Sequence, residues 1–136
     1  MSRERYSKFI EGLDLQQIYL VNLSCSRQVD VEGERWYVDL RPEFRGVDSG
    51  KSEEIRVEAR LRASAHEQKV QMMVVDATFM LVYHSASDTD FDDEIKEIFL
   101  KSNPPLNIWP YAREVISSMT TRMGFPPLII EPYKVY

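Results

Sequence analysis

Five carboxylates crowd into one short stretch of the chain, and calcium binding is the chemistry that such a cluster would support. They stand in the run SDTDFDDE and are Asp88, Asp90, Asp92, Asp93 and Glu94. If Asp88 opened an EF-hand loop, position 6 would be Asp93 rather than Gly, and position 12 would be Phe99 rather than Glu. The run therefore indicates a loop followed by a helix start, and we expect no metal and no cofactor here.

The remaining reactive side chains are one cysteine and two histidines. Cys25 falls on the apolar parity of a predicted strand, which predicts a buried, structural thiol rather than a nucleophile. His66 lies in a predicted turn and His84 at a strand end, and neither has Cys partners at metal-ligand spacing. The sequence has no Gly-rich phosphate loop and no nucleophile motif. We therefore expect a protein that is not an enzyme, with no catalytic residue.

Composition excludes several other classes of function. The 136 residues carry a net charge of −5, and a pI near 5.1 argues against a nucleic-acid partner. No window of about 18 consecutive apolar residues predicts insertion into a membrane. The charged start MSRERYSKFIEGLDL lacks the apolar centre of a signal peptide, and a single cysteine permits no internal disulfide. A cytoplasmic protein is the expectation.

The elements that must position any site follow from apolar periodicity and predict one α+β domain over residues 1–136. An N-terminal amphipathic helix occupies 1–12, antiparallel strands occupy 13–85, helices occupy 90–124 and an extended tail occupies 125–136. Connections of hairpin length predict a four-stranded antiparallel meander. A long C-terminal helix would pack on one face of this sheet.

Prolines divide the helical region in this prediction. A short acidic helix over 92–102 ends at Asn103-Pro104-Pro105, and a second helix starts at Pro110. Gly124 suits the position just beyond that helix, because glycine tolerates a left-handed backbone.

The strand from Val70 to Tyr83 is apolar on both of its faces. One parity contains Val70, Met72 and Val74, and the other contains Met73, Val75 and Phe79. A strand of an antiparallel sheet needs only one apolar face. We expect the long helix to cover the Met73 face, and a ligand or another subunit to cover the second face.

The stretch NIWPYAREVISSMTTRMGFPPLIIEP closely resembles the C-terminal signature of the SecB family of export chaperones. The matching residues are Trp109-Pro110-Tyr111-Ala112-Arg113-Glu114, Ser118-Met119, Arg122, Phe125-Pro126 and Leu128. An Ile18-Tyr19 pair also resembles the family's first strand. The resemblance implies an ATP-independent holdase that assembles as a dimer of dimers and binds unfolded, apolar segments in surface grooves.

Strand parity and this resemblance together give candidate site residues. We predict that clients bind at Trp36, Val70, Met72 and Val74. The residues predicted to lie in the oligomer interface are Tyr19, Trp109, Val115 and Met119. The partners that the resemblance implies are unfolded or nascent proteins, among them an antitoxin, and the translocase motor ATPase.

Three functions stay open from the sequence. The first is a holdase, including a chaperone dedicated to a toxin–antitoxin pair. The second is an export chaperone, although Asn22, Ser26 and Met73 stand where export members carry acidic residues for the motor. The third is a small α+β enzyme or ligand-binding protein with a pocket between sheet and helix.

Overall fold

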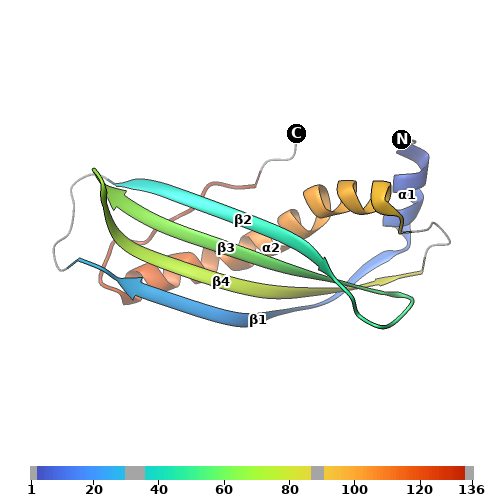
Figure 1. Cartoon of the computed structure of the whole chain (residues 1–136), viewed down its shortest axis with the longest axis horizontal. Coiled ribbons are helices and arrows are strands. Elements are labelled where there is room, and N and C mark those ends of the chain that lie inside the picture. Colours follow the sequence, from blue (N-terminus) through green and yellow to red (C-terminus); the bar gives the residue numbers. More distant parts are fainter. Residues whose placement is uncertain (1–2, 30–35, 87–90, 134–136) are drawn as a thin grey trace.

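The fold is a single antiparallel sheet with one long helix against it (Figure 1). The computed structural model describes residues 3–29, 36–86 and 91–133, so Asp88 and Asp90 of the acidic cluster lie outside the described residues. The elements in chain order are α1 (Arg3–Glu11), β1 (Leu13–Arg27), β2 (Tyr37–Val47), β3 (Glu54–Glu67), β4 (Val70–Ser85) and α2 (Asp93–Arg122). This arrangement confirms the predicted α+β class and the helix on one face of the sheet.

The strand order is β1-β4-β3-β2, and all neighbours are antiparallel. The meander is therefore confirmed for β2 to β4 and wrong for β1, which pairs with β4 instead of β2. A two-residue connection, 68–69, joins β3 to β4, whereas residues 28–36 separate β1 from β2. That longer connection removes the hairpin constraint, so β1 and β2 form opposite edges of the sheet.

The sequence-based prediction of two helices separated by prolines is wrong, because α2 is a single helix that continues through Pro104, Pro105 and Pro110. A proline inside a helix removes the N–H that would bond the carbonyl four residues earlier. Pro104 and Pro105 are buried, so packing on the sheet compensates for part of that loss. The helix ends as expected, with Gly124 just beyond it at a φ of 84°.

The two faces of the sheet differ sharply. The helix-covered face carries Met73, Val75 and Phe79 from β4, all buried, as the sequence predicted. The open face carries alternating charges from β2 and β3, among them the bidentate pair Arg45–Glu58. The core therefore lies between the sheet and α2.

Two β-bulges in β1 change which of its side chains face α2. They lie between Leu15 and Gln17 and between Leu20 and Asn22. Each bulge inserts one residue and reverses the alternation, so Tyr19 falls opposite Met80 on the open face.

Cys25 is exposed, and the prediction of a buried thiol is wrong. The residue does lie opposite the buried Val75 on the helix-covered side. However, α2 packs mainly on β2, β3 and β4, so the edge strand β1 is left with little cover in the single chain.

Helix α1 packs beside the start of α2, as Figure 1 shows. Its Phe9 is fully buried and meets Phe91 and Phe99 edge-on, with ring centroids 5.4 and 5.8 Å away. Asp92 caps α2 by accepting a hydrogen bond from the backbone N–H of Ile95 at 3.0 Å. The helix start predicted for the acidic run is thereby confirmed. No helix in the described part of the chain is long and apolar enough to cross a membrane.

Candidate functional site

Beyond α2 the chain turns back and lies in extended form along the helix as far as residue 133. We call residues 125–133 the tail. Phe125, Leu128 and Ile130 of the tail are buried. Phe125 meets the ring of Trp36 edge-on at 5.2 Å, and the backbone N–H of Leu128 bonds to a threonine hydroxyl of α2. The first part of the tail is therefore a fixed layer on the helix.

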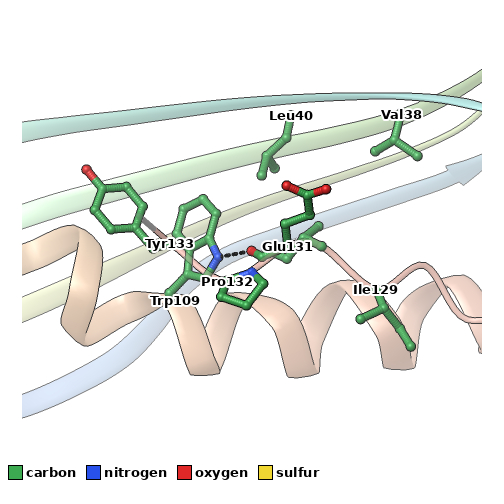
Figure 2. Close-up of a pocket in the computed structure, with 8 residues that line it drawn as sticks. Val38, Leu40, Trp109, Ile129, Glu131, Pro132 and Tyr133 are labelled. Atoms are coloured by element: carbon green, nitrogen blue, oxygen red, sulfur yellow. Dashed lines mark hydrogen bonds between the residues drawn. The ribbon is translucent and has the colours of Figure 1, made fainter. Parts of the chain in front are cut away.

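Trp109 holds the far part of the tail. Its indole Nε1–H donates to the carbonyl of Glu131 at 2.5 Å, and its ring lies 5.0 Å from the ring of Tyr133 (Figure 2). Trp109 is only 8% exposed as a result. The tryptophan before Pro110 thus has a structural task within the chain, which is to anchor the tail.

A groove runs between the edge strand β2 and the layer formed by α2 and the tail. Its first pocket has a volume of about 580 Å³, and Val38 and Leu40 face the tail across it (Figure 2). Its second pocket, of about 380 Å³, lies further along β2 between Phe44 and Pro105. We call the two pockets together the β2 groove. The residues that line them are Val38, Leu40, Pro42, Phe44, Glu97, Leu100, Lys101, Pro105, Trp109 and 129–133.

Tyr133 lines both pockets and stands between them. Its hydroxyl donates to the backbone carbonyl of Lys101 at 3.0 Å. That carbonyl has no helical partner, because Pro105 occupies the position whose N–H would bond it. The proline that was expected to end the helix therefore creates the acceptor that holds Tyr133.

The structure does not gather the four predicted client-binding residues on one surface. Trp36 packs against the tail on the helix-covered face, whereas Val74 is half-buried and lies opposite Ser64 on the open face. Val70 is exposed at the start of β4. The β3–β4 pair has a register shift close to Met72. This shift turns the Met72 side chain into the core, so the residue is only 2% exposed.

The predicted interface residues are also spread over two elements. Tyr19 is exposed on the edge strand β1, and Trp109 is buried against its own tail. Val115 and Met119 are half-buried on α2, where they pack against the core.

The sequence did not predict the groove residues Leu40, Phe44 and Tyr133 as site residues. The first two follow the same apolar parity as Trp36, so strand alternation alone could have added them. Tyr133 carried no local signal, because its partner carbonyl is 32 residues away in the sequence.

The open face carries charged residues of β2 and β3 beside an apolar row of β4. Arg60 lies 2.7 Å from the carboxylate of Asp76, and this hydrogen-bonded pairing holds the pKa of Asp76 below its usual range. Asn22 and Ser26 lie on this face without charge, and Met73 is buried on the other face. Among the described residues, no His, Cys, Asp and Glu side chains gather into a possible metal site.

Comparison with protein families identifies the chain. The model of the family described as "Preprotein translocase subunit SecB" matches residues 11–134. The chain belongs to the SecB family. Members of this family are chaperones rather than enzymes, so the chain has a chaperone or export role.

Individual SecB relatives share about a quarter of their residues with this chain. The protein-export protein SecB of Rickettsia akari is 26% identical over 118 residues, which cover 87% of this chain and 76% of the relative. That of Rickettsia massiliae is 25% identical over 127 residues, covering 93% and 78%.

A solved structure shares the fold. It is that of the SecB-like chaperone Rv1957 of Mycobacterium tuberculosis, in complex with a ChAD peptide from the HigA1 antitoxin. The match has a TM-score of 0.79 and covers 98% of this chain and 99% of the other, at 15% identity.

Proposed function

We propose that this protein is an ATP-independent holdase that binds unfolded, apolar segments of client proteins in the β2 groove. The observation that carries the proposal is an open, largely apolar groove beside a sheet edge, with Trp109 and Tyr133 in its wall. The first pocket alone has a volume within the range of about 300–1,000 Å³ that is typical of ligand sites.

Binding in this groove combines two physical contributions. Apolar client side chains would leave water against Val38, Leu40 and Phe44, at about 25 cal/mol per Å² of apolar surface. The outer edge of β2 pairs with no other strand of the described sheet, so an extended client backbone could pair with it on either side of Pro42, which has no N–H to donate. Neither contribution depends on a particular client sequence, which is what a holdase needs.

We also propose a homo-oligomer, a dimer of dimers built through β1 and α2. The edge strand β1 presents Leu20 and Val21 to solvent, and α2 presents Leu106 and Tyr111. Exposed apolar residues on an unpaired edge favour pairing with a second copy. Several grooves on one particle would hold a long client by avidity, each contact being weak.

The clients that we propose are unfolded or nascent chains in the cytoplasm, including an antitoxin segment. The fold shared with a chaperone solved together with an antitoxin peptide supports this choice. Delivery of preproteins to the translocase motor is the second candidate, supported by the export role named for the Rickettsia relatives. The uncharged Asn22 and Ser26 on the open face favour the first candidate.

Suppression of aggregation without ATP tests the proposal. An unfolded model protein is diluted into buffer with and without the purified protein, and light scattering is followed. We expect scattering to fall as the chaperone approaches stoichiometric amounts, whereas an inert protein of similar charge has no effect. A protein that is monomeric and leaves scattering unchanged contradicts the proposal. A binding measurement with the C-terminal segment of the translocase motor ATPase distinguishes an export chaperone, which should bind it, from a chaperone dedicated to an antitoxin, which should not.

A further inference from the structure

The tail is fixed by three buried side chains and one backbone hydrogen bond, and the side chain of Tyr133 at its far end is held less firmly. Phe125, Leu128 and Ile130 are buried, and the Glu131 carbonyl accepts the short hydrogen bond from Trp109. Tyr133, by contrast, is half-buried, and its hydroxyl bonds to a carbonyl at the exposed surface. Water can replace a hydrogen bond at an exposed carbonyl, so release of this side chain costs far less than release of the rest of the tail.

Release of Tyr133 would join the two pockets. It is the one described residue that lines both of them, and it stands between the Val38–Leu40 and Pro42–Phe44 parts of β2. A continuous groove from Val38 to Phe44 is roughly 20 Å long at the rise of a β-strand. Such a groove accepts an extended segment rather than two separate side chains.

The place that Tyr133 leaves has a definite chemistry. One side is the ring of Trp109, and the other is the Lys101 carbonyl, which Pro105 leaves without a helical donor. An aromatic ring packs best against the indole. A hydroxyl or ring N–H in addition restores the hydrogen bond to the carbonyl.

We propose that Tyr133 is a gate within the β2 groove, and that clients open it by putting an aromatic side chain of their own in its place. The inference rests on the proposed holdase function and names its substrate class. That class is extended segments with apolar residues in alternate positions and a central aromatic residue, with Tyr preferred to Phe and Phe to Leu.

Short extended peptides that differ only in the central residue test the gate. Labelled peptides with Tyr, Phe or Leu at the centre are titrated into the full-length protein, and fluorescence anisotropy gives their affinities. The gate predicts that Tyr133→Ala binds all three more tightly, by about two- to fivefold, because the competing ring has been removed. In the wild type and in Tyr133→Ala, we expect the Tyr peptide to bind most tightly, the Phe peptide less tightly and the Leu peptide least tightly. Tyr133→Phe, which loses only the hydroxyl, should show a smaller gain.

Two further measurements keep the test specific. In a Trp36→Phe variant Trp109 is the only tryptophan, so its emission should change when a peptide displaces Tyr133. Tyr37→Ala is the matched control, because Tyr37 is exposed and points to the opposite face, and its peptide affinities should equal those of the wild type.

The outcomes separate this inference from the holdase proposal. Peptides that bind without an aromatic preference, or with unchanged or weaker affinity in Tyr133→Ala, overturn the gate and leave the holdase in place. Absence of binding by every peptide to every variant overturns both.

Discussion

The two edge strands of the sheet, β1 and β2, differ in how many of their residues oppose pairing with another chain. In β1, the stretch 15–26 contains no charged residue and no proline. In β2, charged residues alternate with apolar ones from Asp39 to Arg45, and Pro42 stands in the middle. Charges and proline on an edge strand oppose indiscriminate pairing. We infer that β1 is built for a permanent partner and β2 for solvent and transient clients.

Apolar exposure alone does not make this distinction. Val21 on β1 is 51% exposed and Val38 on β2 is 46% exposed. What differs is their surroundings, because Val38 faces the tail across the first pocket, whereas Val21 lies at a bulge on an uncovered edge. In our proposal, the same residue type therefore serves assembly at one edge and client binding at the other.

The largest expected effect is loss of assembly when a charge is placed on β1. Val21→Glu would bring two like charges together wherever two copies of β1 meet, at the cost of burying an unpaired carboxylate. We expect the oligomer to dissociate by at least one step at micromolar concentration, as measured by sedimentation velocity. Assembly identical to that of the wild type would show that β1 is not the interface.

A smaller effect is expected from removing the protection of β2. The triple change Arg41→Thr, Pro42→Val and Glu43→Thr leaves the net charge unchanged and makes this edge resemble β1. The surface ion pair between Arg41 and Asp39 is lost, which costs at most about 1 kcal/mol. We expect association beyond the wild-type state that grows with concentration in light scattering. A variant that keeps the wild-type size at high concentration would contradict the protective role.

The smallest effect concerns the charge lattice on the open face. Because Arg60 lowers the pKa of Asp76 in the folded state, this pair stabilises the fold above the unfolded pKa of about 4. Its contribution disappears as the pH falls through the lower folded value. Asp76→Asn should therefore be less stable than the wild type at neutral pH, by up to about 1 kcal/mol, with a difference that vanishes in strong acid.

Urea unfolding at several pH values measures this difference. Asp39→Asn is the matched control, since it removes a more exposed carboxylate from the edge strand. A gap between wild type and Asp76→Asn that persists unchanged at the lowest pH would rule out the ion pair as its cause.

Local patterns were sufficient for the features that depend on neighbouring residues. Helix α1, the helix start at the acidic run, the left-handed Gly124 and the Met73 face covered by helix all follow from spacing and residue type. Each of these features is decided within a few turns of helix or one strand, where propensity and parity act directly.

Features that depend on distant contacts were not predictable in the same way. The helix continues past Pro105, and the carbonyl that this proline leaves without a helical donor is bonded by Tyr133. Bulges moved Tyr19 to the open face, and a register shift accompanies the burial of Met72, although simple alternation predicts otherwise. The β2 groove was not predicted because the tail forms part of its second wall. No local sequence pattern indicates that the tail lies opposite β2.

The central claim is that clients bind at β2 and that copies of the chain meet at β1. The most direct measurement is the affinity of one labelled, unfolded client for Val38→Glu and for Val21→Glu, with the oligomeric state of each variant measured alongside. The account predicts that Val38→Glu keeps the wild-type assembly and loses client affinity by about tenfold or more, because a buried unpaired carboxylate costs at least about 1.4 kcal/mol. Val21→Glu should lose assembly while each chain still binds short peptides. Undiminished client affinity in Val38→Glu would contradict the account.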